Sequence, residues 1–282
     1  MSVSNRPPLR PLWAEINLTA IQENIKQVKA LVGPGVKVMA VVKAEAYGHG
    51  ARETAQAARE VGVDWFGVAT PEEGIALRQA GITGNILVFG PLLPEQAAAF
   101  IDYQLVGSVA TVESAQALAE KARQRGVELR VHLKIDTGMG RVGFRPEQVG
   151  EEIKKILALS NLKIEGIYSH FATADGSDLT YARQQLATFR QVLAGLEQDG
   201  IKIPLVHLAN SGGIINLPAS HFDLVRAGII LYGLAPARES LPHCPPLQPA
   251  FALKTQVVQI KRVPAGTGIS YGLTYHTKHE TG

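Results

Sequence analysis

Residues 38–50 read V-M-A-V-V-K-A-E-A-Y-G-H-G, an apolar run that leads into a lysine and then into a glycine-rich bend. The five apolar residues predict a buried strand that ends on Lys43. Tyr47 and the segment Gly48-His49-Gly50 predict a tight turn directly after that strand. A lysine placed there presents its amine beside backbone N–H groups, although most strand-end lysines simply reach water.

Apolar runs of this kind recur along the chain, and each is followed by residues with helical periodicity. A strand at residues 13–17 and a helix at 18–32 come before the first run. The predicted core strands cover residues 38–43, 65–69, 85–89, 105–109, 129–135, 163–168, 205–209 and 222–226. The predicted helices between and after them cover residues 51–61, 70–80, 94–103, 111–125, 146–159, 180–198 and 211–215.

Strands that alternate with helices over about 200 residues predict an α/β fold, a closed (β/α)8 barrel of the TIM type. An open dinucleotide-binding sheet is disfavoured, because no Gly-x-Gly-x-x-Gly sequence follows the first core strand. We assign residues 1–236 to the barrel domain.

Five prolines fall between residues 236 and 249, a composition that indicates a linker. Residues 253–263 and 269–275 then alternate like strands around a turn at 264–268. A hairpin of this length is too small to form its own core. Residues 237–282 are therefore interpreted as a linker and the start of a β-rich C-terminal domain, which either packs on the barrel or is cut short.

The composition excludes several classes of partner. The 282 residues carry a net charge of +3 and no basic run, so we expect no nucleic acid. The single cysteine, Cys244, excludes an internal disulfide. Residues 1–8 lack the apolar core of a signal peptide, and no apolar run approaches the roughly 18 residues of a membrane span. The expected location is the cytoplasm.

Polar residues gather where the predicted strands end, which is where barrel enzymes carry their active sites. Each has a purely structural alternative. His170 would then bond a backbone carbonyl, Arg226 would pair with Asp223, and Ser211 would cap a helix. Asp136-Thr137-Gly138 would be only a tight turn. Their convergence on one face favours a binding site. The residues concerned are Lys43, Tyr47, Lys134, Arg141, His170, Asn210, Ser211, Arg226, Gly228 and Ile229.

The chemistry of this face narrows the choice of ligand. Glycines 212, 213 and 228 follow the last two core strands, where barrels commonly bind a phosphate on backbone N–H groups. Neighbouring cations lower the pKa of a lysine amine and so make it available to form a Schiff base. A phosphate site beside a reactive lysine indicates pyridoxal 5′-phosphate.

The motifs at these strand ends resemble those of the alanine racemases, barrel-type (fold type III) pyridoxal-phosphate enzymes. The resemblance extends from about Trp13 to the end of the chain. The motifs that carry it are AVVKAEAYGHG at 40–50, KIDTGMGR at 134–141, SHFATAD at 169–175, HLANS at 207–211, RAGIILYG at 226–233 and SYG at 270–272.

The resemblance implies a role for each residue. Lys43 would bind the cofactor aldehyde and act as the base on one face of the substrate, and Tyr271 would act on the other face from the partner subunit of a homodimer. Arg141 would bind the substrate, and Lys134 would orient it, often as a carbamate. The residues implied to hold the cofactor are Lys43, Tyr47, His170, Asn210, Ser211, Arg226, Gly228 and Ile229, with Arg226 facing the pyridine nitrogen.

The implied reaction is the interconversion of L- and D-alanine in the bacterial cytoplasm, which supplies D-alanine for peptidoglycan; no metal is expected. The chain departs from the family at Glu45, where asparagine is usual, and it stops soon after Tyr271, so the C-terminal domain is expected to be truncated. A non-catalytic pyridoxal-phosphate carrier, a decarboxylase or aldolase, and an amino-acid racemase of broader specificity are the alternatives. The segment 270–272 argues against the carrier, the decarboxylase and the aldolase.

Overall fold

The computed structural model describes residues 10–282, so the prediction made for residues 1–8 lies outside it. The chain forms two compact units. One contains the residues up to Ile16 together with Phe251–Gly282, and the other is Asn17–Ala250. This division differs from the boundary inferred at residue 236, because the following segment is hydrogen-bonded to the larger unit. The Gln248 N–H donates to Asn24 Oδ1 at 2.7 Å, and the Ala250 N–H donates to the Tyr232 carbonyl at 3.1 Å.

The larger unit is the predicted (β/α)8 barrel. Its strands are all parallel and follow the order β8-β7-β6-β5-β4-β3-β2-β9. Two backbone hydrogen bonds connect the segments of β8 and β9, the first and last strands of this order, and so close the barrel. The Asp223 N–H donates to the Val206 carbonyl (3.1 Å), and the Arg226 N–H donates to the Ala209 carbonyl (3.0 Å). The strands are β2 (Lys37–Val41), β3 (Trp65–Val68), β4 (Asn85–Pro91), β5 (Val106–Val109), β6 (Leu129–Lys134), β7 (Leu162–Tyr168), β8 (Leu205–His207) and β9 (Leu224–Ala227).

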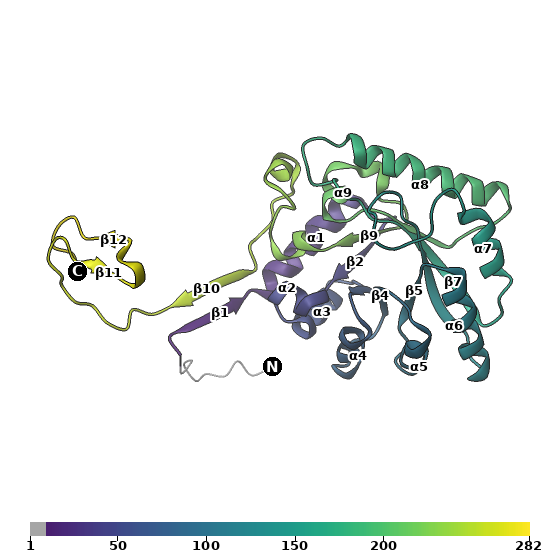
Figure 1. Ribbon diagram of the computed structural model, residues 1–282, viewed down its shortest axis with the longest axis horizontal. Helices are drawn as coiled ribbons and strands as arrows, with labels where there is room; N and C mark the ends of the chain where they lie inside the picture. Colours follow the sequence, from purple (N-terminus) through teal and green to yellow (C-terminus); the bar gives the residue numbers. More distant parts are fainter. Residues whose placement is uncertain (1–9) are drawn as a thin grey trace. The chain divides into compact units, whose positions relative to one another are not determined.

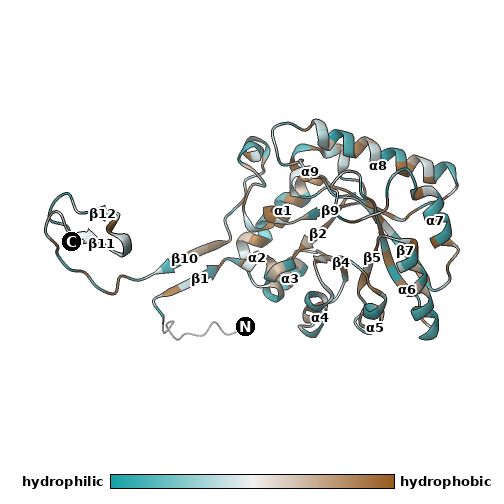
Figure 2. Ribbon diagram, viewed as in Figure 1, coloured by the Kyte–Doolittle hydropathy of each residue, from teal (hydrophilic) through white to brown (hydrophobic). Residues whose placement is uncertain are grey.

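Helices surround these strands, and Figure 1 shows α4 to α8 lying along the outside of the barrel. Apolar residues concentrate on the strands, whereas the outer surfaces of α6 and α8 are largely hydrophilic (Figure 2). The helices are α1 (Leu18–Val32), α2 (Lys43–Gly48), α3 (Ala51–Glu60), α4 (Pro71–Gln79), α5 (Ala97–Asp102), α6 (Val112–Gln124), α7 (Val149–Leu157), α8 (Thr180–Gln198) and α9 (Ser211–Asn216). The 3-10 turns are η1 (Pro94–Gln96), η2 (Pro218–Ser220), η3 (Ile229–Tyr232) and η4 (Arg238–His243).

Apolar side chains from successive strands fill the barrel interior and leave the carboxyl ends of the strands for polar residues. Burial of this cluster of side chains removes apolar surface from water and so contributes to the stability of the barrel. Partly buried Phe89 packs against it. The cluster consists of Met39, Trp65, Leu87, Val106, Leu205 and Leu224.

The smaller unit contains little regular structure. Its strand β1 (Leu12–Ile16) pairs antiparallel with β10 (Phe251–Thr255), and Lys254 Nζ lies 2.6 Å from Glu15 Oε2. The strand predicted at 253–263 is wrong beyond Thr255, because β1 offers only five residues with which to pair. The strand predicted at 269–275 is also interrupted. It consists of β11 (Gly268–Ile269), the 3-10 turn η5 (Tyr271–Leu273) and β12 (Tyr275–His276).

Candidate active site

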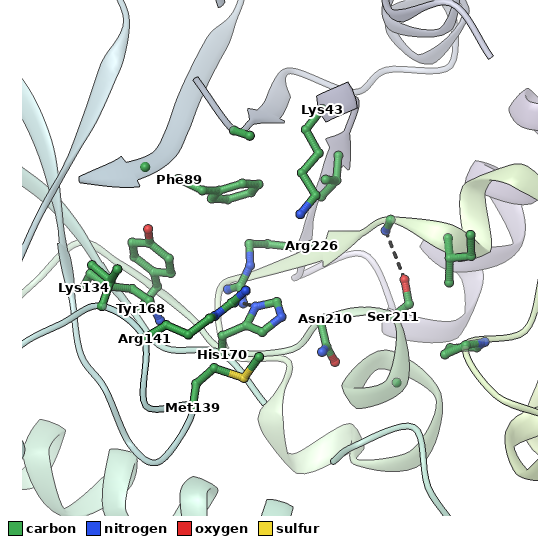
Figure 3. Close-up of a pocket in the computed structure, with 18 of the residues that line it drawn as sticks. Lys43, Phe89, Lys134, Met139, Arg141, Tyr168, His170, Asn210, Ser211 and Arg226 are labelled. Carbon is green, nitrogen blue, oxygen red and sulfur yellow. Dashed lines mark hydrogen bonds between the residues drawn. The ribbon is translucent and has the colours of Figure 1, made fainter. Parts of the chain in front are cut away.

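A cavity of about 600 Å³ opens at the carboxyl ends of the barrel strands. The cationic side chains of Lys43, Lys134, Arg141 and Arg226 all line it (Figure 3). Every site residue predicted within the barrel lies on its wall. The lining residues from that prediction are Lys43, Tyr47, Lys134, Arg141, His170, Asn210, Ser211, Arg226, Gly228 and Ile229.

The prediction that the first core strand ends on Lys43 is wrong. Lys43 is instead the first residue of the left-handed turn α2. Strand β2 ends at Val41, and four consecutive non-glycine residues, 44–47, have φ between 51° and 56°. An L-residue in this region costs roughly 1–2 kcal/mol, so a run of four stores several kcal/mol of strain. Hydrogen bonds hold the turn, from Ala44 N–H to Glu73 Oε1 (2.7 Å) and from Gly50 N–H to the Glu45 carbonyl (2.9 Å). This turn aims Lys43 into the cavity.

Relief of this strain gives a stability prediction. Ala44 is exposed at φ 51°, so Ala44→Gly removes the steric cost and loses little buried surface. We expect the free energy of unfolding to rise by about 0.5–1 kcal/mol in urea titrations. Ala30→Gly is the matched control, because the exposed Ala30 lies in right-handed α1 and its replacement should lower stability by about 1 kcal/mol. Equal losses in both variants would contradict the assigned strain.

Asp136 organises the loop that presents Arg141. Its Oδ1 accepts the backbone N–H groups of Gly138, Met139 and Gly140 at 2.8–3.0 Å, and its Oδ2 accepts that of Arg141 at 3.1 Å. The tight turn considered as the structural alternative is therefore present, and it also places the arginine at the cavity.

Arg226 is the centre of the buried polar network. Its Nη1 donates to His207 Nδ1 at 3.0 Å, and its Nη2 lies 3.0 Å from His170 Nδ1 and 2.8 Å from the Ser169 carbonyl. Burial lowers the pKa of Arg226 to about 10, which leaves it protonated at neutral pH. The bonds observed differ from the two structural alternatives: Asp223 Oδ2 accepts the Val206 N–H, and His170 Nδ1 accepts from Arg226.

These bonds fix the tautomers of a row of neutral histidines. Because Arg226 donates to His207 Nδ1, the proton of His207 lies on Nε2 and is donated to His132 Nδ1 at 2.9 Å. The Nε2 of His132 then carries a proton and lies 3.9 Å from Glu165 Oε2. Burial, reinforced by the charge on Arg226, holds the pKa of His207 well below its usual range. The row therefore adds no charge to the cationic cavity.

Lys134 is buried beside other cations and rests on an aromatic ring. Its Nζ lies 4.8 Å from the centroid of the Tyr168 ring, and the Arg226 guanidinium carbon lies 5.4 Å from that centroid. The ring stacks on His207 with an interplanar angle of 2°. Burial first, and then the charge on Arg226, lowers the pKa of Lys134 to about 7. At neutral pH a large fraction of this amine is therefore uncharged and nucleophilic.

The opposite side of the cavity offers a site for an anion. The Gly228 N–H donates to Ser211 Oγ at 3.1 Å (Figure 3), so Ser211 is not the helix cap that the structural alternative predicted. Asn210 has that role, because its Oδ1 accepts the Gly213 N–H at 3.0 Å. A Cβ atom at Gly228 would lie 3.1 Å from Tyr47 Oη, so the hydroxyl of Tyr47 lies close to the Gly228 backbone. Tyr47, Ser211 and Gly228 thus form one hydrogen-bonding edge.

The sequence prediction missed several residues of the wall. Tyr168 and Phe89 both line the cavity near the carboxyl ends of core strands, so the strand-end rule applied to every strand would have found them. Met139 and Asp175 fall within the motifs at 134–141 and 169–175 without an implied role, and both lie on the wall.

Tyr271 belongs to the smaller unit, where it begins η5 and its side chain is 100% exposed. It is therefore not part of the cavity within the barrel. Among residues 10–282, no cluster of histidine, cysteine and carboxylate side chains is arranged to hold a metal ion. The same part of the chain contains no helix with the length and apolar character needed to cross a membrane.

A parallel eight-stranded barrel with lysine and arginine side chains converging on a cavity at its strand ends has the architecture in which barrel enzymes carry their active sites. Residues 16–236 match the family described as alanine racemase, N-terminal domain. The alanine racemase of Halothermothrix orenii is 45% identical over 277 residues, which cover 98% of this chain and 73% of that protein. The chain belongs to the alanine racemase family.

Solved structures agree with this assignment. The alanine racemase of Clostridium difficile 630 superposes with a TM-score of 0.92 at 39% identity, over 97% of this chain and 72% of that one. A histidine racemase from Leuconostoc mesenteroides superposes with a TM-score of 0.87 at 30% identity, over 98% and 73% of the two chains. The fold is therefore shared by racemases of different substrates.

Proposed function

We propose that this chain is the subunit of a pyridoxal-phosphate-dependent alanine racemase that interconverts L- and D-alanine. The observation that carries the proposal is the position of Lys43, which enters a cationic cavity whose wall also contains the hydrogen-bonding edge of Tyr47, Ser211 and Gly228. Relatives that are 40–47% identical over nearly the whole chain are alanine racemases. These relatives disfavour the alternative of a non-catalytic pyridoxal-phosphate carrier. They support the assignment of this protein to the isomerases.

The residues of the cavity fit pyridoxal 5′-phosphate. A volume of about 600 Å³ is in the range of small-molecule sites. The phosphate would bind to the edge formed by Tyr47, Ser211 and Gly228, with the neighbouring Ile229 backbone and Asn210 supporting it. Lys43 would hold the aldehyde carbon. When bound, the cofactor supplies an electron sink for the charge that develops when the α-proton leaves.

Racemisation requires an acid/base group on each face of the α-carbon, since one group removes a proton and the other returns one. Lys43 would serve one face with its Nζ. We propose that Tyr271 serves the other face from the partner subunit of a homodimer. Arg141 would hold the substrate carboxylate, to which a guanidinium is well matched. The product, D-alanine, is proposed to enter bacterial peptidoglycan.

Arg226 is proposed to control which reaction follows proton removal. The guanidinium remains protonated, so a ring nitrogen beside it stays unprotonated and withdraws electrons less strongly. We expect Arg226→Glu to raise pyruvate formation from alanine at least about tenfold relative to racemisation, which corresponds to about 1.4 kcal/mol in relative barrier height. A lactate dehydrogenase assay measures the pyruvate. Arg226→Lys, which retains a cation, is the control, and an unchanged pyruvate yield in Arg226→Glu would remove this role from Arg226.

Lys134 is proposed to react with carbon dioxide, because its neutral amine can attack the carbon and release one proton to solvent. The resulting anion would lie between Arg226 and Arg141 and reduce their repulsion. With a pKa of about 7, the neutral fraction rises from about 10% at pH 6 to about 90% at pH 8. With 13C-bicarbonate, we expect a carbamate signal in 13C NMR that grows over this range and is absent from Lys134→Ala. No signal at pH 8 would count against the modification.

Incubation of the cofactor-loaded protein with L-alanine in deuterated water tests the proposed function. The expected products are both enantiomers with deuterium on the α-carbon. Pyruvate or ethylamine as the main product would redirect the assignment to a transaminase or a decarboxylase. Parallel assays with L-histidine and L-serine test the broader-specificity alternative, which predicts comparable rates with several amino acids.

A further inference from the structure

The strained turn that carries Lys43 is held at its entrance by a tyrosine outside the cavity wall. Tyr232 Oη donates a hydrogen bond of 2.9 Å to the carbonyl of Val41. Val41 is the last residue of β2 and lies two residues before Lys43. The position of the lysine backbone is therefore tied to this hydroxyl group.

The ring of the same tyrosine also contacts the exit of the turn. Its centroid lies 4.4 Å from that of His49 and 5.3 Å from that of Tyr47. The left-handed residues 44–47 are thus bracketed by contacts to a single side chain. A conformation that L-residues disfavour persists only where the surrounding structure determines it, and Tyr232 meets that requirement at both ends.

Tyr232 is itself rigidly held. It is 1% exposed, and its carbonyl accepts the Ala250 N–H at 3.1 Å. The preceding carbonyl, of Leu231, accepts from Asn24 Nδ2 of α1 at 3.0 Å. Burial raises the pKa of the Tyr232 phenol, so the hydroxyl remains a donor throughout the neutral range.

Tyr232 also connects the turn to the proposed phosphate-binding edge. It is the last residue of η3, which begins at Ile229, directly after Gly228. Tyr47, whose ring contacts Tyr232, places its Oη beside Gly228. One short segment therefore contacts both the group proposed to bind phosphate and the turn that presents the lysine.

We propose that Tyr232 is a positioning residue that sets the place of Lys43 relative to the phosphate-binding edge by clamping both ends of the left-handed turn. The inference rests on the proposed function, since Lys43 is taken to be the cofactor lysine. It assigns Tyr232 no contact with the cofactor or the substrate.

Hydrogen exchange of the protein without cofactor tests the clamp directly. The amides of Ala46, His49 and Gly50 donate within the turn at 2.9–3.1 Å. In Tyr232→Phe, which keeps the ring and loses the hydroxyl, we expect these amides to exchange about fivefold faster, the effect of one buried hydrogen bond. Thr111→Ala is the matched control, because it removes the cap of α6, distant in sequence from the turn, and should leave the three amides unchanged.

Cofactor affinity provides the second measurement. We expect the Kd for pyridoxal 5′-phosphate to rise about fivefold in Tyr232→Phe and further in Tyr232→Leu, with no change in Thr111→Ala. Unchanged exchange and unchanged affinity in both Tyr232 variants would overturn the clamp. If the wild-type protein binds no pyridoxal phosphate while exchange still responds to Tyr232→Phe, the proposed function fails and the clamp on the turn stands.

Discussion

Lys43→Ala is expected to abolish racemisation, with kcat reduced by at least about 10⁴-fold. The substitution removes both the amine that would hold the cofactor and the base for one face of the substrate, and each of these roles alone contributes a large factor. The other lysine described on the cavity wall, Lys134, rests on the Tyr168 ring and is not expected to replace Lys43. Chiral chromatography of the products measures the loss.

Lys37→Ala is the matched control. Lys37 lies on the same strand, β2, at its opposite end, where it is exposed. Its replacement should leave both the rate and the stability close to those of the unmodified protein. Borohydride reduction of the cofactor-loaded protein, followed by peptide mapping, should label Lys43 in the control and nothing at position 43 in the variant. Racemisation by Lys43→Ala within tenfold of the wild-type rate would refute the assignment.

Mixing two inactive variants is expected to restore activity if the active site is shared between subunits. Tyr271→Phe alone should lower the rate by about 10²–10⁴-fold, because one face of the substrate loses its proton donor. In a mixed dimer with Lys43→Ala, one site regains an intact lysine and an intact tyrosine. If equal amounts of the two variants pair at random, about half of the dimers are mixed, and each mixed dimer has one intact site out of two. The mixture then has up to about a quarter of the wild-type activity.

The exposure of Tyr271 motivates this experiment. A tyrosine whose side chain is 100% exposed within its own chain has its entire apolar ring available to a partner. Tyr275→Phe is the matched control, since Tyr275 is a neighbouring exposed tyrosine whose replacement should change little. Dimers that form between the two variants but show no recovered activity would exclude a shared site.

The barrel was predictable because its signals are local and repeated. The predicted bounds of the helices at 18–32 and 180–198 agree with α1 and α8, since long amphipathic segments with clear ends leave little choice. The residues after each strand converge on one cavity because parallel strands end on the same face. This rule predicted that Lys43, Ser211 and Arg226 line one cavity, and all three lie on its wall.

The remaining features depend on contacts between distant parts of the chain. Nothing in the local sequence favours a left-handed run through Ala44 and Tyr47, because each of these residues prefers other conformations. The link from Arg226 through His207 to His132 joins positions up to 94 residues apart in the sequence. The prediction of a strand beyond Thr255 is wrong for a related reason. Alternation of apolar and polar residues predicts a strand but does not show whether a neighbouring strand is present to pair with it.

The left-handed turn has a consequence for how many destabilising mutations the barrel can accept. Its strain is a sizeable fraction of the roughly 5–15 kcal/mol that separates a folded protein from its unfolded chain. The favourable interactions in the rest of the barrel must therefore offset this strain in addition to the conformational entropy lost on folding. Destabilising mutations elsewhere are therefore tolerated less well than they would be in the same barrel without this turn.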